Sequence, residues 1–201
     1  MYYDAVSGKP ARDTTLRAIE VIGAGVPRTA VDIGAGDGRD SAVLVEAGFD
    51  VLAIDPHPDA ARRLIERAAG MSPDAGRRLH VMIGGAESLD AAVAMRPNFE
   101  RCGVVNASFS LPFVRPERYA RAWATIRRVL APGGVFAGQF FGERDSWAAI
   151  EGRSHHTKEE VASRLAGLDV VECREEEKDG HDATGQAKHW HVFHVVARRA
   201  E

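Results

Sequence analysis

The sequence predicts an α/β fold: a mostly parallel sheet of seven strands with helices on both faces and a closing antiparallel hairpin. Two observations support this fold. Short apolar runs alternate with segments of helical apolar spacing along most of the 201 residues. The last two apolar runs have no helical segment between them, which is typical of antiparallel neighbours. The length fits one domain, residues 1–201, in which residues 1–10 are a candidate lid.

The predicted elements follow one another regularly along the chain. Apolar residues at a helical spacing predict a first helix over 11–24, and a buried run then predicts a strand over 29–33. The alternation continues with helix 39–47, strand 50–54, helix 59–69, strand 80–83, helix 87–94, strand 103–107, helix 116–130, strand 135–141 and helix 158–166, and it ends with strands 169–174 and 189–197, joined by the polar stretch Glu175–Ala187. Ligands bind such sheets at the carboxyl ends of the strands, so functional residues are expected directly after the first four strands.

Composition and charge exclude several classes of protein. The net charge of −3 argues against a protein that binds nucleic acid through its phosphates. The two cysteines, Cys102 and Cys173, form no C-x-x-C motif, so neither a disulfide scaffold nor a zinc site built from cysteines is expected. No apolar run approaches the ~18–20 residues of a membrane span. The first residues also lack the features of a signal peptide, so we expect a cytoplasmic protein without a membrane partner.

The most specific motif is a glycine-rich turn, Asp32–Gly38, between the first predicted strand and the helix after it. Dinucleotide-binding turns have glycine at the first, third and sixth positions. Counted from Gly34, the sixth position here is Arg39. Three carboxylates, Asp32, Asp37 and Asp40, would also lie beside the pyrophosphate, at a Coulomb cost that a helix N-terminus hardly offsets. The turn therefore favours a ligand with an amino group and a sulfonium cation over a dinucleotide.

A second acidic position, Asp55, follows the second predicted strand. A carboxylate at this place can accept hydrogen bonds from both hydroxyl groups of a ribose. It could instead cap the helix that follows. Because the acid and the glycine turn occur together at a suitable separation, we favour ligand binding.

The glycine turn, Asp55 and the segment Pro132-Gly133-Gly134 before the fifth strand together resemble the class I S-adenosylmethionine-dependent methyltransferases. The resemblance extends from about Arg12 to Arg199, without an inserted substrate domain. The chain is most similar to the compact small-molecule enzymes, such as the tellurite- and thiopurine-type methyltransferases. The resemblance implies a Rossmann-like fold and S-adenosyl-L-methionine as the cofactor.

The resemblance also implies roles for individual residues. The turn would pass under the methionine and ribose of the cofactor, with Asp32 near the cofactor amino group, and Asp55 would bind the ribose hydroxyls. The implied cofactor-binding residues are Asp32, Gly34, Ala35, Gly36, Gly38, Asp55, Pro56, His57, Ala86, Glu87 and Asn106. Pro56 and His57 would pack on the adenine, and Ala86 and Glu87 would contact its amino group, although Glu87 could equally be a charge in a helix first turn.

The acceptor is expected after the fourth strand, where segment 106–113 would face the transferred methyl group. This segment departs from the Asn/Asp-Pro-Pro-aromatic motif of nucleic-acid amino methyltransferases, which argues against a nucleic-acid acceptor. Phe109 and Phe113 are candidate acceptor-pocket residues, with core packing as the alternative for each. Trp147 and Arg144, in the loop after the fifth strand, are expected to border the same site.

Methyl transfer from a sulfonium requires alignment above all, so no catalytic motif is needed. We therefore expect a methyltransferase with a small-molecule acceptor, whose accepting atom (O, N or S) and whose oligomeric state the sequence leaves open. The alternatives are a protein or peptide methyltransferase on the same fold, a nicotinamide-dependent oxidoreductase and a noncatalytic nucleotide-binding module.

Histidines gather near the end of the sequence. His189 and His191 share one face of the last predicted strand, which could indicate a metal site, a structural role or a base. Because a histidine titrates near pH 6.5, His189 at the start of the strand is the candidate general base. At the other end, Tyr2-Tyr3-Asp4 could fold over the cofactor, with Arg12 meeting its carboxylate.

Overall fold

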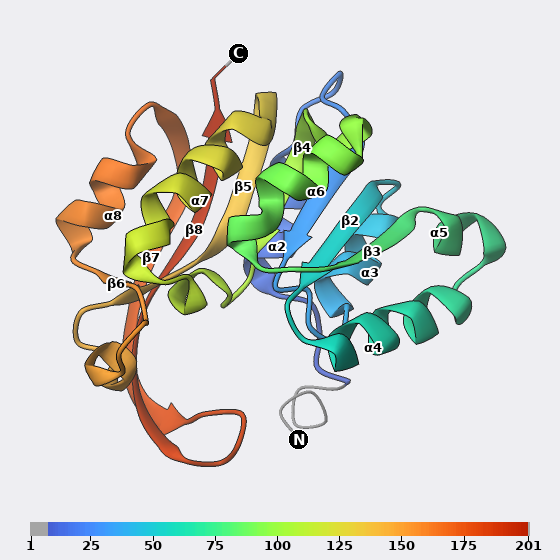
Figure 1. Cartoon of the computed structure of the whole chain (residues 1–201). Coiled ribbons are helices and arrows are strands. Elements are labelled where there is room, and N and C mark those ends of the chain that lie inside the picture. Colours follow the sequence, from blue (N-terminus) through green and yellow to red (C-terminus); the bar gives the residue numbers. More distant parts are fainter. Residues whose placement is uncertain (1–7, 201) are drawn as a thin grey trace.

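A single mixed sheet forms the centre of the computed structural model, which describes residues 8–200 (Figure 1). The strand order is β3-β2-β1-β4-β5-β8-β7, and a further short strand, β6, pairs with β5. The strands are β1 (Thr29–Ile33), β2 (Asp50–Asp55), β3 (Leu79–Ile83), β4 (Cys102–Ala107), β5 (Leu130–Gly142), β6 (His155–His156), β7 (Leu168–His181) and β8 (Ala187–Arg199). The pairings of β8 with β5 and with β7 are antiparallel and the other strand pairings are parallel, which confirms the predicted fold class and the final hairpin.

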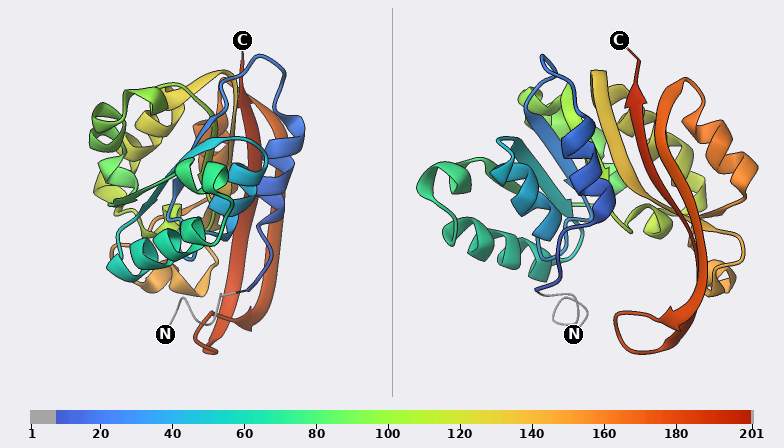
Figure 2. Two further views of the ribbon diagram at one scale, coloured as in Figure 1. Left: turned by 90° about the vertical axis from the view of Figure 1, so that its right-hand side faces the viewer. Right: turned by 180° about the vertical axis from the view of Figure 1, so that it is seen from behind.

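Helices cover both faces of the sheet, as Figure 2 shows. They are α2 (Asp13–Val21), α3 (Arg39–Glu46), α4 (Pro58–Ala69), α5 (Pro73–Arg77), α6 (Leu89–Met95), α7 (Pro116–Val129) and α8 (Lys158–Leu165), with short 3-10 helices η1 (Ala86–Ser88), η2 (Pro97–Phe99), η3 (Leu111–Phe113) and η4 (Ser146–Ala149). One buried core includes side chains of α2, α3 and α4, and the other includes side chains of α6, α7 and α8. No helix within residues 8–200 has the length and apolar character needed to cross a bilayer.

Local sequence explains why the elements begin where they do. Strands β1 and β4 are buried almost throughout, because both of their faces are covered by helices. Helix α8 begins with a capping box: the Thr157 hydroxyl accepts the N–H of Glu160, and the Glu160 carboxylate accepts the N–H of Thr157. Helices α4 and α7 each carry a proline at the start, where its missing N–H costs nothing.

The closing hairpin is much longer than the sequence predicts. The polar stretch expected to connect the last two strands is itself strand up to His181, and β8 begins at Ala187. The last pair between β5 and β8 joins Phe141 to Val192, so the hairpin continues past the carboxyl end of the sheet. Figure 2 shows this overhang below the helical layers. Helix α5 and strand β6 were likewise not expected, and most of the candidate lid, residues 1–7, lies outside the described residues.

Candidate cofactor and acceptor site

A pocket of about 540 Å³ opens at the carboxyl ends of β1, β2, β3 and β4. This is the end of the sheet where the sequence predicts the site. The predicted residues that line it are Gly34, Ala35, Gly36, Asp55, Pro56, His57, Ala86, Glu87, Phe109 and Phe113. Arg12 lines it as well, and its backbone N–H donates to Asp40 Oδ1 at 2.7 Å. Its predicted contact with a cofactor carboxylate stays a prediction.

The glycine turn is held by hydrogen bonds of its own backbone. The N–H groups of Gly34 and Ala35 both donate to the carbonyl oxygen of Ile54, at 2.7 and 3.1 Å. The Gly36 N–H donates to Asp55 Oδ2 at 2.9 Å. A pyrophosphate-binding turn presents such N–H groups to its ligand. Because this turn uses them internally, the geometry supports the sequence argument against a dinucleotide.

The glycines serve two different purposes. A β-carbon on Gly34, whose φ is +71°, would overlap the side chain of Ser110 in the loop after β4. Gly34 therefore lets two walls of the pocket approach each other. Gly38 also has a positive φ, of +80°, but a β-carbon there would come within 2.6 Å of Leu64 Cδ2 in α4. Gly38 does not line the pocket, so the structure assigns it to packing.

Asp55 ties the glycine turn to the end of β2. Its Oδ2 accepts the N–H of Gly36 and its Oδ1 accepts the N–H of His57, both at 2.9 Å. The alternative role of Asp55 as a helix cap is wrong. The N-terminal cap of α4 is His57, whose Nδ1 accepts the Asp59 N–H at 3.1 Å. The Asp55 carboxylate thus lies in the pocket wall with both oxygens oriented by the backbone.

Asp32 and Asn106 lie beneath the pocket rather than in its lining. Asp32 is 1% exposed and accepts hydrogen bonds from Ser41 Oγ at 2.6 Å and Asn106 Nδ2 at 2.8 Å. Burial and the charges of Asp40 and Asp55 raise the pKa of Asp32 to about 7, against the lowering effect of the two hydrogen bonds. Carboxylates outnumber arginines in the pocket lining, which suits a cationic ligand: the lining includes Asp37, Asp40, Asp55, Asp59 and Glu87 against Arg12 and Arg39. A direct contact of Asp32 or Asn106 with the cofactor stays a prediction.

Phe109 connects the pocket to the other half of the sheet. It is the one non-glycine residue with positive φ, 54°, within residues 8–200. Its N–H donates to Gln139 Oε1 of β5 at 2.9 Å. Its ring makes edge contacts with Phe141, Trp190 and His194, and the Arg12 guanidinium carbon lies 4.2 Å from the ring centre. A strained backbone held by this many contacts is typical of functional sites.

An aromatic wall continues from Phe113 away from the pocket. The ring centres of Phe113 and Trp147 are 6.0 Å apart, and those of Trp147 and Trp190 are 5.9 Å apart. Behind them the buried Lys188 ammonium pairs with Asp145, with Nζ 4.0 Å from the Trp147 ring centre and 4.4 Å from that of Trp190. Trp147 therefore contacts Phe113 of the pocket lining but does not itself line the pocket. Nothing in the sequence predicted the buried ion pair of Lys188 and Asp145.

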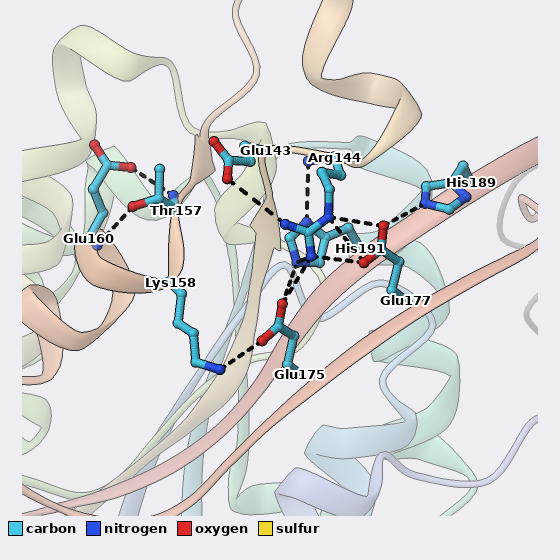
Figure 3. Close-up of polar contacts among 9 residues, drawn as sticks. All are labelled: Glu143, Arg144, Thr157, Lys158, Glu160, Glu175, Glu177, His189 and His191. Atoms are coloured by element: carbon cyan, nitrogen blue, oxygen red, sulfur yellow. Dashed lines mark hydrogen bonds and ion pairs between the residues drawn. The ribbon is translucent and has the colours of Figure 1, made fainter.

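The structure argues against the choice of His189 as the base (Figure 3). Successive side chains of a strand point to opposite faces. Trp190 faces Phe109, whereas His189 lies on the other face of β8, outside the pocket lining. Its Nδ1 is 2.7 Å from Asp179 Oδ1 and its Nε2 is 3.1 Å from Glu177 Oε1, and these carboxylates raise its pKa. A histidine that holds its proton more tightly is a poorer base at neutral pH.

The other residues of that face form an ion-pair network (Figure 3). Arg144 bridges Glu175 and Glu177, and the buried His191 contacts both Arg144 and Glu175. Arg144 therefore lies in this network and not, as expected from the sequence, beside the acceptor site. Within residues 8–200 no group of three histidine, cysteine, aspartate or glutamate side chains is arranged to hold a metal ion.

The sequence matches a known protein family. A family model described as a methyltransferase domain matches residues 30–134. No curated protein matches the sequence.

Solved structures match most of the chain. TehB from Haemophilus influenzae aligns with a TM-score of 0.71 and 16% identity over 94% of this chain, which spans only 62% of TehB. NodS, an N-methyltransferase from Bradyrhizobium japonicum, aligns with a TM-score of 0.68 and 16% identity over 93% of each chain. The Burkholderia thailandensis 1,6-didemethyltoxoflavin-N1-methyltransferase aligns with a TM-score of 0.62 and 22% identity over 100% of this chain and 84% of its own. These likenesses show the fold, and the family match shows that the chain belongs to the methyltransferase-domain family.

Proposed function

We propose that the chain transfers a methyl group from S-adenosylmethionine to a small-molecule acceptor. The class of enzyme follows from the family match. The pocket itself supports this cofactor: the N–H groups of Gly34, Ala35 and Gly36 are bonded within the protein, the Asp55 carboxylate is oriented, and acidic side chains outnumber basic ones in the lining. All three fit a cation that carries a ribose better than a diphosphate.

The residues present fit this cofactor. The bound sulfonium would supply a methyl group to a nucleophile placed in line with its S–CH3 bond. Asp55 would accept the ribose hydroxyls, while Pro56 and His57 would pack against the adenine from the adjacent wall. Ala86 and Glu87 line the pocket at the end of β3, where the adenine amino group is expected. The ionised form of Asp32, just below the turn, would attract the cofactor amino group.

The acceptor would approach from the side of the pocket formed by Phe109 and Phe113. The volume of about 540 Å³ lies within the range of roughly 300–1,000 Å³ that is usual for small-molecule sites. A solved neighbour, the Burkholderia thailandensis enzyme above, has 1,6-didemethyltoxoflavin and S-adenosylhomocysteine bound, which supports a small acceptor. Another neighbour, MtfA, is a glycopeptide N-methyltransferase at a TM-score of 0.62 and 17% identity, so a peptide acceptor is the second candidate.

Catalysis in this site would consist mainly of positioning. The strained Phe109 backbone and its four aromatic or cationic neighbours fix the wall against which an acceptor would rest. Such alignment supplies up to ~7–11 kcal/mol in favourable cases. An amine or thiolate acceptor would then need no enzyme base, whereas a hydroxyl acceptor would.

Calorimetry tests which cofactor the protein binds, and a methyl-labelled donor tests which class of molecule accepts the methyl group. We expect S-adenosylmethionine and S-adenosylhomocysteine to bind, and NADH and NADPH not to bind. Binding of the nicotinamide cofactors alone would overturn the proposal. Incubation of a metabolite extract with methyl-labelled donor, followed by mass spectrometry, should then yield a labelled small molecule. Label recovered only in peptides or proteins would favour the second candidate.

A further inference from the structure

A half-buried arginine, Arg153, lies against the aromatic wall beside the pocket. Its guanidinium carbon is 4.0 Å from the ring centre of Phe113 and 5.4 Å from that of Trp147. The two rings meet at an interplanar angle of 70°, so they form a corner over which the cation lies. Phe113 is shared: one ring both lines the pocket and supports Arg153.

The Arg153 guanidinium has no hydrogen bond or ion pair among residues 8–200. Burial lowers its pKa, and no neighbouring carboxylate offsets this effect. The adjacent Lys188 is different, because Asp145 neutralises it. This corner of the molecule therefore carries one positive charge that the described part of the chain leaves unbalanced, in a protein whose pocket is otherwise rich in acids.

The backbone holds Arg153 in this place. The neighbouring Ser154 donates its N–H to Pro112 at 2.9 Å and its hydroxyl to Val114 at 2.6 Å. These bonds fasten the loop after β5 to η3, the segment that presents Phe113. An arginine that is positioned by the backbone, stacked on one ring of the pocket lining and unpaired among the described residues is prepared to bind an anion rather than to stabilise the fold.

This inference rests on the proposed function: we propose that the acceptor is a small aromatic carboxylate, whose ring packs against Phe113 in the pocket and whose carboxylate pairs with Arg153, the cation that lies on the same phenylalanine ring. A guanidinium binds a carboxylate in a planar, two-bonded geometry that suits this stacking. A single cation also matches a single negative charge. A phosphate would bring more negative charge toward a pocket that already contains Asp40, Asp55 and Glu87.

The test compares carboxylates with their uncharged amides. Protein saturated with S-adenosylhomocysteine is titrated by calorimetry with 2-, 3- and 4-hydroxybenzoate and 1-naphthoate, and with the primary amide of each. In the unmodified protein we expect at least one carboxylate to bind at least ~10-fold more tightly than its amide. In Arg153→Gln this preference should fall below about twofold, and Arg153→Lys should retain part of it because the charge remains.

Arg101→Gln is the matched control, because Arg101 is an exposed arginine just before β4, at the opposite end of the sheet. It should keep the full preference, and Arg153→Gln should bind S-adenosylhomocysteine as the unmodified protein does. Three results would overturn the inference: no carboxylate preference in the unmodified protein, a preference that survives in Arg153→Gln, or loss of S-adenosylhomocysteine binding in that variant alone. Failure of the unmodified protein to bind S-adenosylhomocysteine would instead overturn the proposed function.

Discussion

The glycine turn and the β7–β8 hairpin lie at the same end of the sheet but are built in opposite ways. In the turn, backbone N–H groups donate to partners at the end of the adjacent strand, such as Ile54 and Asp55. In the hairpin, charged side chains from separate segments pair with one another, as when Arg144 bridges Glu175 and Glu177. A backbone-built site follows from local sequence, whereas a side-chain network depends on which face each strand presents.

The two regions also differ in charge balance. Beneath the pocket, burial above all, together with the charges of Asp40 and Asp55, raises the pKa of Asp32 to about 7. In the hairpin, Lys158, His191 and Arg144 lower the pKa of Glu175 to about 2. The hairpin network is therefore neutralised within the chain. The pocket is left with a charge imbalance that a cationic ligand would relieve, so substitutions in the two regions should affect different measurements.

The largest effect is expected from Gly34→Ala. The new β-carbon would overlap Ser110, and the backbone has a positive φ that alanine adopts only with strain. We expect cofactor affinity, measured by calorimetry, to fall at least ~100-fold. Gly25→Ala is the matched control, since Gly25 also has positive φ, +86°, but its β-carbon would meet nothing within 4 Å. Equal losses of affinity in the two variants would show that strain alone, and not the pocket, is responsible.

A smaller effect is expected from Asp55→Ala. Loss of hydrogen bonds to a charged group costs about 1.5–3 kcal/mol, or one to two decades of cofactor affinity. Circular dichroism should stay native, because the sheet does not depend on this side chain. Asp50→Ala, at the other end of the same strand, should bind normally. Unchanged affinity in a folded Asp55→Ala variant would remove the ribose assignment.

The pH dependence of cofactor binding gives the third test. If the ionised Asp32 is the binding form, its fraction falls about tenfold between pH 8 and pH 6, and affinity should fall with it. Asp32→Asn should show no such fall. The ratio of the two proteins' affinities cancels the titration of the ligand's own amino group. A ratio that stays constant from pH 6 to 8 would contradict the role of Asp32.

The raised pKa of Asp32 also predicts how the free energy of unfolding depends on pH. The folded-state pKa of Asp32 lies above its ordinary value of 3.8, so the folded protein keeps a proton that the unfolded chain has released. The free energy of unfolding should therefore fall as pH rises from about 4 to about 7, and this contribution should be absent in Asp32→Asn. Urea unfolding at several pH values measures both proteins.

The smallest effect is expected from His189→Ala. The ring lies on the face of β8 away from Phe109, so turnover should stay within about threefold of the unmodified protein. Trp190→Ala, one residue along, should lower turnover about tenfold by removing a wall of the acceptor side. A loss of ~100-fold in His189→Ala would restore this histidine as the base.

The pocket could be predicted from the sequence to a greater extent than the hairpin. Strands β1 to β5 and the pocket residues Gly34 and Asp55 were predictable, because apolar periodicity and a local turn determine them. The length of β7 was not, since Glu175–Asp179 reads as a polar connection and becomes strand only by pairing with β8. The face of His189 follows from that same register. Arg153 was missed for a related reason: its contact with Phe113 joins two loops that are distant in sequence.

The position of β8 has a consequence for how the protein is made. Although β8 is the last strand along the chain, it lies between β5 and β7, and it pairs Val135 with Arg198. Its side chains also enter both hydrophobic cores, through Val195 on one face and Val196 on the other. While residues up to 199 are still being synthesised, β5 presents an open and mostly apolar edge. Such pairing between distant segments forms slowly and leaves nascent chains prone to association, so chaperone binding during translation should protect this edge.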